Sequence, residues 1–206
     1  MFTKTGALRY IGHLDLQTLW ERAARRASLP LAYSHGFHPQ PKINFASALP
    51  LGYSSRAEVL DMRLQEDMEP AELRSRLMAA MPDGISVLDV RTVDEAEPAL
   101  QMQVTAAEYE VTVPEDGLTD ALQRGLERLL GAETLPRVRR EKPYDLRPLI
   151  EELRIVRDGT GTKPPRLFMR LTAREGATGR PDEVLDELGI ALRDARVERT
   201  RLIFGD

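Results

Sequence analysis

Residues 33–52 bring together side chains able to bind an anionic or aromatic ligand. The stretch reads Tyr-Ser-His-Gly-Phe-His-Pro-Gln-Pro-Lys-Ile-Asn-Phe-Ala-Ser-Ala-Leu-Pro-Leu-Gly, so aromatic rings, two histidines and a lysine lie close in the chain. Rings stack on the bases of single-stranded RNA, and lysine or arginine contacts the phosphates. We therefore take Tyr33, His35, Phe37, His38 and Lys42 as candidate RNA-binding residues.

The glycines and prolines of the same stretch predict a defined shape. Glycine adopts backbone angles that other residues avoid, whereas proline fixes its own angle and restricts the residue before it. The pattern predicts a rigid loop that runs into an extended segment over residues 42–49, and such loops often carry function. The alternative is a structural crossover in which the prolines only direct the chain.

A second group of candidates lies near the start of the chain. His13 and Asp15 are two residues apart at a predicted helix start, and with Arg9 they could position a substrate. The alternative is a structural one, because Asp is a favoured N-cap that accepts backbone N–H bonds, with a hydrogen-bonded His beside it.

A third group lies in the second half of the chain. The cluster Arg137, Arg139, Arg140 and Lys142 comes just before Asp145 and Arg147, where it lines a groove between domains or forms a solvated loop. Arg180 either holds an acidic group of a partner or simply precedes a helix. The candidate RNA-binding residues in this half are Arg139, Arg140, Asp145, Arg147 and Arg180.

Known catalytic signatures are missing from the sequence. No phosphate-binding Walker loop, nucleophile elbow, zinc-protease helix or dinucleotide fingerprint occurs. Gly159-Thr-Gly-Thr is not followed by the Lys-Ser/Thr pair and the helix of a phosphate loop, so we interpret it as a hairpin or flexible loop. A metal site would need three convergent ligands, and only His13, His35 and His38 are histidines. We expect no metal site.

Composition bounds the class of protein. The 206 residues are 42% hydrophobic and 30% charged, which fits one large or two small folded domains. With no cysteine, the chain can ligate neither a cysteine-bound zinc nor an iron–sulfur cluster. No apolar run approaches the roughly 20 residues of a membrane span, and the start lacks a signal peptide's apolar core. We expect a cytoplasmic protein that does not bind membranes.

The net charge of −4 conceals an uneven distribution. Residues 1–56 hold seven Lys/Arg against two Asp/Glu, residues 57–136 six against eighteen, and residues 137–206 sixteen against thirteen. Because salt screens charges beyond about 8–10 Å, the local sign decides which ligands are attracted. The basic start of the chain therefore allows an anionic ligand despite the acidic total.

The periodicity of apolar residues predicts an α+β fold. Strands are expected at 7–11, 29–34, 42–49, 57–65 and 85–93, with helices at 16–27 and 71–81. The second half repeats this scheme, with strands at 108–113, 135–139, 166–173 and 196–204, helices at 118–130 and 181–188, and an ambiguous segment at 151–156. Each half follows a β-α-β-β-α-β order, which predicts two tandem ferredoxin-like units, 1–95 and 104–206.

Four motifs of the chain resemble the radical-SAM-linked protein family. These are the segments 2–16, 33–52, Tyr144-Asp-Leu-Arg-Pro-Leu-Ile and Arg180-Pro-Asp-Glu-Val-Leu, in the family's order. Members commonly carry Gln, Asn and His where this chain has His35, His38 and Gln40, and Ser where it has Gly12. These departures argue against fixed catalytic or metal roles for the two histidines.

The resemblance implies a bacterial domain of unknown function that accompanies a radical SAM enzyme, as a separate chain or fused to it. The iron–sulfur cluster and S-adenosylmethionine are then expected on the partner, and this chain needs no cofactor. Genes of that family are often neighbours of genes for ribosomal proteins and an RNA-processing ribonuclease, so the resemblance implies RNA as the substrate.

Three functions remain open from the sequence. The first is a non-catalytic accessory that binds RNA and presents it to the radical SAM protein. The second is an RNA endonuclease of the tandem ferredoxin-like type, with His13 and His35 as candidate catalytic groups, by analogy of fold only. The third is a module that only docks the radical SAM partner.

Overall fold

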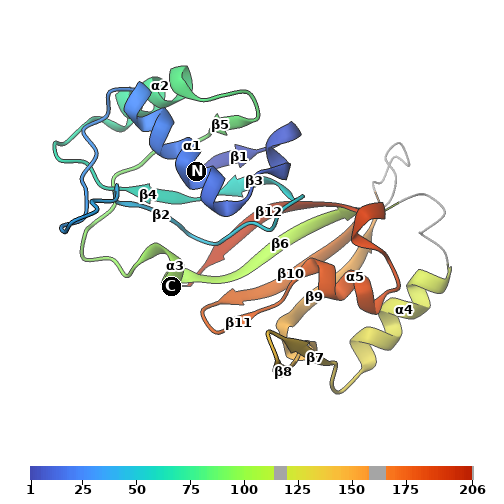
Figure 1. Cartoon of the computed structure of the whole chain (residues 1–206). Helices are drawn as coiled ribbons and strands as arrows, with labels where there is room; N and C mark the ends of the chain where they lie inside the picture. The colour runs from blue at the N-terminus through green and yellow to red at the C-terminus, as the bar shows by residue number, and fades with distance from the viewer. Residues whose placement is uncertain (114–119, 158–165, 206) are drawn as a thin grey trace. The chain divides into compact units, whose positions relative to one another are not determined.

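The chain divides into two compact units, residues 1–104 and 105–205, in a computed structural model that describes residues 1–113, 120–157 and 166–205. Helices and mainly antiparallel strands occur in both units, as expected for an α+β protein (Figure 1). Within the described ranges, no helix is long and apolar enough to cross a membrane.

Unit 1 is built around a short central strand. The strand β1 (Phe2–Lys4) pairs antiparallel with β3 (Ser54–Glu58) on one side and with β5 (Ile85–Val87) on the other. Two further strands, β2 (Ile43–Phe45) and β4 (Leu60–Met62), pair antiparallel with each other. The helices are α1 (His13–Arg26), α2 (Pro70–Ala80) and the single turn α3 (Leu100–Gln103).

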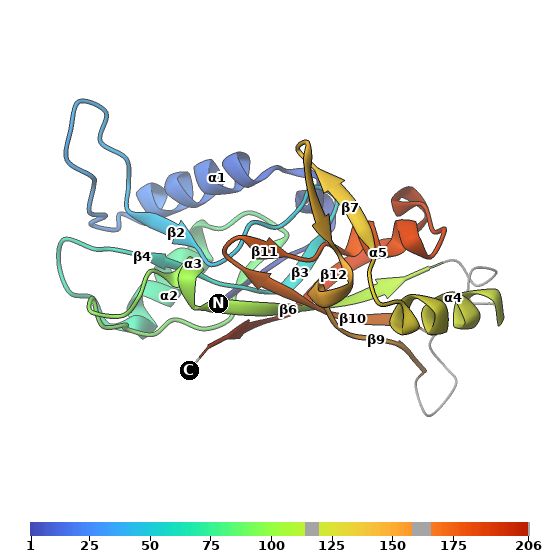
Figure 2. The same cartoon turned by 90° about the horizontal axis from the view of Figure 1, so that it is seen from below.

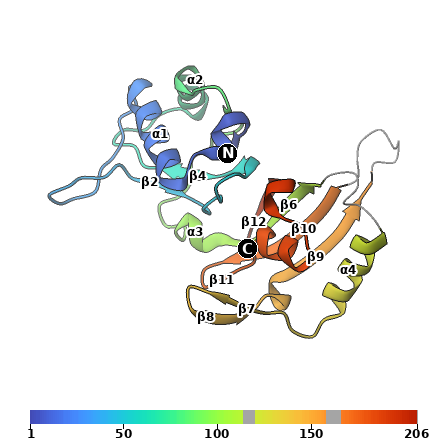
Figure 3. The same cartoon turned by 45° about the vertical axis from the view of Figure 1, so that its right-hand side comes forward.

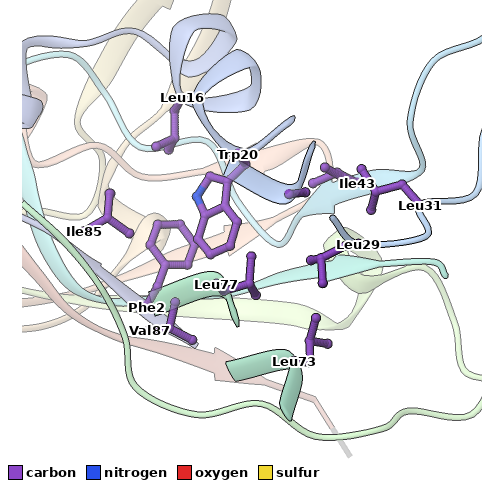
Figure 4. Close-up of a cluster of buried hydrophobic side chains, with 11 residues drawn as sticks. Phe2, Leu16, Trp20, Leu29, Leu31, Ile43, Leu73, Leu77, Ile85 and Val87 are labelled. Carbon is purple, nitrogen blue, oxygen red and sulfur yellow. The ribbon is translucent and has the colours of Figure 1, made fainter. Parts of the chain in front are cut away.

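The core of unit 1 forms where both long helices cover the same strands. Figure 4 shows Trp20 of α1 and Leu77 of α2 pointing toward Phe2 of β1. The rings of Phe2 and Trp20 meet edge to face with centroids 4.8 Å apart, and each side chain is almost fully buried. Burying two such aromatic side chains removes a large apolar area from water, so this contact fixes α1 on the sheet.

Unit 2 has longer strands. The sheet order is β9 (Ile150–Val156), β10 (Arg166–Arg174), β6 (Val104–Thr112) and β12 (Arg196–Phe204), and the short β11 (Ala177–Thr178) also pairs with β10. The helices α4 (Asp120–Gly131) and α5 (Pro181–Glu187) and the hairpin β7 (Pro136–Arg139) and β8 (Lys142–Asp145) complete the unit.

Alternation along the central strand of unit 2 separates an apolar face from a charged one. Leu167, Met169 and Leu171 are fully buried, whereas Arg166 and Arg170 point the other way. Arg170 pairs with Glu108 of β6 at 2.6 Å, and Arg166 pairs with Glu110. These arginines are therefore already neutralised by the neighbouring strand.

The prediction of a strand at residues 7–11 is wrong. Gly6–Tyr10 form a 3-10 helix, and the first strand lies earlier, at Phe2–Lys4. The chain leaves the extended conformation at Gly6, whose φ of 60° does not occur in a regular strand. Gly84 holds this turn from the facing segment: its carbonyl accepts from Thr5 N at 2.8 Å, and a Cβ there would come within 2.8 Å of the Thr5 carbonyl oxygen.

Other predicted strands are shorter than expected. The segment predicted as a strand at 85–93 leaves the sheet after Val87, because its partner β1 spans only three residues. Residues 29–34 form only isolated bridges, and the strand predicted at 42–49 is limited to Ile43–Phe45. The ambiguous segment at 151–156 is strand β9. Residues 159–162, interpreted as a hairpin or flexible loop, lie outside the described residues.

The end of α1 provides a test of the backbone geometry. Ser28 follows the helix with φ 54°, and Leu29 N donates to Ala24 O at 3.0 Å, which is a glycine-type C-terminal cap made without glycine. We expect Ser28→Gly to raise the free energy of unfolding by about 0.5–1 kcal/mol, because glycine avoids the cost of the left-handed conformation. Chemical denaturation measures this change.

Ala27 is the matched control for Ser28. Its φ is −73°, an ordinary helical value that gains nothing from glycine, so Ala27→Gly should lower the stability. Equal effects of the two glycine substitutions would contradict the assigned cap geometry.

Candidate functional site

Residues 31–43 form an arm that leaves unit 1 between α1 and β2. Figures 2 and 3 show this segment reaching away from the helices and strands of the unit. Tyr33 bridges to Pro41, so the two limbs of the arm are paired, and Leu31 bridges to Leu64, which ties the base of the arm to the segment after β4. The arm is thus a narrow projection with two limbs.

Backbone hydrogen bonds tie the base of the arm to the segment that follows β4. Lys42 N donates to Ala32 O at 2.9 Å, Ala32 N to Arg63 O at 2.8 Å, and Arg63 N to Lys42 O at 3.0 Å. Three segments thus hold one another in a closed ring of bonds. Nearer the tip, Ser34 N donates to Gln40 O at 2.8 Å, and Gln40 N donates to the Ser34 hydroxyl at 2.9 Å.

The tip of the arm exposes its rings. Phe37 is fully exposed, with a relative accessible surface area of 102%, and His35 and His38 beside it are also exposed. Tyr33 is 41% exposed, whereas Lys42 at the base is half-buried. Gly36 permits the turn at the tip with a φ of 133°, an angle that strains any residue with a Cβ.

The candidates near the start of the chain lie in the same unit but make local contacts. Arg9 places its guanidinium 4.6 Å from the centroid of the Tyr10 ring and donates to the Tyr10 hydroxyl. The His13 ring packs edge to face on Phe45, with centroids 5.2 Å apart. These contacts explain both positions structurally, and neither side chain is placed at the tip of the arm.

The predicted capping role of Asp15 is not found. The helix α1 begins at His13 with Gly12 as its N-cap, so Asp15 lies within the first turn and is exposed. A carboxylate in the first turn still interacts favourably with the helix dipole. His13 is the first helical residue rather than a partner of the cap.

In unit 2, the predicted cations Arg139 and Arg180 are held by acidic side chains. Nε and Nη2 of Arg139 donate to the two carboxylate oxygens of Glu183, at 3.0 and 2.5 Å, and the guanidinium lies 4.7 Å from the Tyr144 ring centroid. Arg180 pairs with Asp182 at 2.9 Å. These bonds fasten the β7–β8 hairpin and the start of α5, so neither cation needs a ligand.

Tyr144 belongs to the same cluster. Burial raises the pKa of the Tyr144 phenol, and the hydrogen bond and negative charge of Glu183 raise this pKa further. The phenol is therefore protonated at neutral pH, and its oxygen accepts a hydrogen bond from Arg139 at 3.2 Å.

Asp145 and Arg147 also have structural partners. The Asp145 carboxylate accepts from the backbone N–H groups of Leu135 at 2.7 Å and Arg147 at 2.9 Å. Arg147 donates to the carbonyls of Leu130 at 2.8 Å and Ile150 at 3.3 Å. They organise the connection between the hairpin and β9, a role that their sequence does not reveal.

Arg140 is the predicted cation of the hairpin that remains exposed. It occupies the turn between β7 and β8 with φ 50°, next to Glu141 with φ 65°. Two successive residues with positive φ are typical of a tight hairpin turn. Within the described residues, Arg140 makes no ion pair.

No group of three or more His, Asp and Glu side chains in the described ranges is arranged to hold a metal ion. The three histidines do not form such a group.

Comparison with known proteins gives one result. A family model described as an uncharacterized protein conserved in bacteria (DUF2344) matches residues 1–181. No curated protein matches the chain. The matched residues include unit 1 with its arm, and in unit 2 they extend to the start of α5.

The contacts of Arg139 generate a stability prediction. We expect Arg139→Ala to lower the free energy of unfolding by about 1–2 kcal/mol, because it removes a partly buried, two-bond ion pair and a stacking contact. Chemical denaturation followed by circular dichroism measures this change.

Arg140→Ala is the matched control, since it removes the same side chain from the next residue without breaking an ion pair. Its effect should stay within about 0.5 kcal/mol. If both substitutions cost the same, Arg139 does not fasten the hairpin as described.

Proposed function

The chain belongs to the DUF2344 family, and we propose that it is a non-catalytic accessory of a radical SAM enzyme that binds RNA through the arm of unit 1. The observation that carries this proposal is the complete exposure of Phe37 at the tip of a tethered projection. An exposed phenylalanine leaves a large apolar area in water, and this ring does not contribute to the core of its own unit.

The chemistry around the ring favours an anionic, aromatic ligand. Residues 22–57 contain five Lys/Arg and no Asp/Glu, so the arm and its flanks carry a local charge of +5. Unpaired nucleotides offer both a π-face for Phe37 and phosphates for the cations. Single-stranded RNA therefore suits the arm better than an acidic peptide, which offers charge without bases.

The fold is compatible with this use. We infer that each unit is ferredoxin-like, and two features support the inference. In unit 2 the strand order β9–β10–β6–β12 places the first and third strands of a β-α-β-β-α-β unit side by side in the middle of the sheet. In unit 1 the order β3–β1–β5 places the first strand next to the third, whereas β2 pairs with β4 outside this sheet. Four-stranded sheets of this kind carry RNA in other proteins, which is an analogy of fold only.

The proposed partner supplies the chemistry. These 206 residues contain no cysteine, so an iron–sulfur cluster that activates S-adenosylmethionine has to be ligated elsewhere, on a partner chain or on a fused domain. The resemblance of the four motifs to the radical-SAM-linked family supports a radical SAM protein as that chain. In this proposal the present protein binds the RNA and holds it for the enzyme.

Truncation of the tip ring tests the RNA contact. We expect Phe37→Ala to weaken binding of a fluorescein-labelled, mixed-sequence single-stranded RNA by about 5- to 150-fold, since one stacked base contributes about 1–3 kcal/mol. Fluorescence anisotropy at low salt measures the affinity, and thermal unfolding should be unchanged because the side chain is exposed.

Met78→Ala is the control for the loss of an exposed apolar side chain. Met78 is 49% exposed on α2, outside the arm, and its truncation should leave RNA affinity unchanged. Absence of RNA binding by the wild-type protein at micromolar concentration, alone and with the partner, would refute the function.

Co-expression with a radical SAM protein of the kind that accompanies the resembled family tests the partnership. We expect the two chains to copurify together with RNA, and Phe37→Ala to reduce the attached RNA without releasing the enzyme. A complex that forms without RNA, and whose assembly depends on Phe37, would instead select a protein-docking role for the arm.

A further inference from the structure

A second surface of unit 1 lies along α1. A groove of about 330 Å³ runs between this helix and the end of α2. It is lined by Asp15, Thr18, Leu19, Arg22, Ala23, Arg26, Ala80 and Pro82. Arg22 and Arg26 are four residues apart and so occupy one face of the helix.

Arg26 is held in place at the groove. Its Nη1 donates to the Ala80 carbonyl at the end of α2, at a distance of 2.9 Å. A guanidinium has five N–H donors in a fixed planar fork, so one bond to a carbonyl orients the group and leaves donors for a ligand. Because Arg26 is exposed, these donors are open to solvent.

Arg22 carries a charge that the protein does not neutralise. It is exposed, and within the described part of the chain its side chain forms no ion pair or hydrogen bond. This contrasts with Arg166 and Arg170 in the sheet of unit 2, each of which faces a glutamate. One turn of helix separates Arg22 from Arg26, so both guanidinium groups can contact the same or adjacent phosphates.

The acid in the groove does not cancel these charges. Asp15 lies seven residues before Arg22, which corresponds to about 10 Å along the helix axis. That separation is comparable to the Debye length at physiological salt, so the attraction between the two side chains is largely screened. The end of the groove formed by Arg22 and Arg26 is therefore positive.

The position of this end relates it to the arm. Arg26 is the last residue of α1, and the arm begins at Leu31, so both surfaces belong to unit 1 and are close in the chain (Figure 2). A turn at Ala27 and Ser28 ends the helix, and no further helix or named strand intervenes before Leu31. The short connection places this end of the groove and the base of the arm next to each other in the chain.

We propose that Arg22 and Arg26 bind backbone phosphates of the single-stranded RNA whose bases the arm holds. This inference rests on the proposed function and extends it by assigning base contacts and phosphate contacts to two different surfaces. The arm contributes ring stacking, which does not depend on salt, and the α1 groove contributes charge-assisted hydrogen bonds to phosphate oxygens, which do.

The salt dependence of binding separates the two contributions. For single-stranded nucleic acid, each phosphate contact adds about 0.7 to the slope of log affinity against log salt concentration. We expect Arg22→Gln and Arg26→Gln each to lower this slope by up to about 0.7, and Phe37→Ala to lower the affinity with the slope unchanged. The probe is a fluorescein-labelled, mixed-sequence single-stranded RNA of about 12 nucleotides, a length within the usual site sizes.

Arg25→Gln is the matched control. Arg25 is exposed in the last turn of the same helix but does not line the groove, so its loss removes an equal charge from a neighbouring position. Its slope should remain within error of the wild-type slope. Arg22→Gln guards against misfolding as an explanation, because Arg22 holds no other group in place, whereas Arg26 binds the Ala80 carbonyl.

The outcomes distinguish this inference from the proposed function. Suppose that the wild-type protein binds the RNA and Phe37→Ala weakens this binding, but Arg22→Gln and Arg26→Gln leave the slope unchanged. The proposed phosphate site is then wrong, whereas RNA binding by the arm is supported. Equal slope changes for Arg22→Gln and Arg25→Gln would also overturn the site, because they indicate a diffuse field. If no RNA binds, both proposals fail.

Discussion

The base of the arm is the constraint on which the account depends. Three backbone hydrogen bonds connect Ala32, Lys42 and Arg63 in a closed ring, and each is worth about 0.5–1.5 kcal/mol. Without this ring, residues 33–41 would have to be ordered on binding, at a cost of about 1–2 kcal/mol per residue. The ring therefore converts a stretch that would otherwise be a loose loop into a recognition element whose ordering is completed during folding.

The same unit links this projection to its core. Trp20 packs on Phe2 in the centre of unit 1, and Arg22 and Arg26 lie on the exposed side of the same helix. Apolar burial fixes the helix, and the helix fixes the two cations. Unit 2 uses its charges differently, because Arg139, Arg166 and Arg170 are each paired with a glutamate from a neighbouring element. In unit 1 the positive charge is concentrated locally, because residues 22–57 hold five Lys/Arg and no Asp/Glu.

Much of this arrangement could be predicted from the sequence. Strong periodicity placed α1, α2, α5 and β12 within a few residues, because apolar spacing, Pro70 or Pro181 at a helix start, and Gly189 after a helix are local signals. The exposure of the tip also followed from local chemistry. The prediction of a strand at 7–11 was wrong because Gly6 turns the chain. The prediction that the strand continues beyond Val87 was wrong because its three-residue partner strand limits the pairing. The length of a partner strand depends on a distant part of the chain and cannot be predicted from one segment alone.

The roles of single charged residues were the least predictable. Arg139, Asp145 and Arg180 share residue types and spacing with ligand-binding clusters, yet their partners are residues such as Glu183, Leu135 and Asp182. Whether a cation is satisfied depends on which side chain the fold places opposite it. The groove on α1 was missed for the converse reason: two arginines on a helix look like ordinary surface until Ala80 is found beside them.

Ultraviolet crosslinking of single-stranded RNA to the protein, followed by tryptic digestion and mass spectrometry, tests the central claim most directly. Trypsin cleavage after Arg26 and Lys42 isolates residues 27–42, which contain the whole tip of the arm. The account predicts that the principal nucleotide adduct lies in this peptide, on Tyr33, Phe37 or a histidine beside them. Adducts confined to other peptides, with residues 27–42 recovered unmodified, would contradict it.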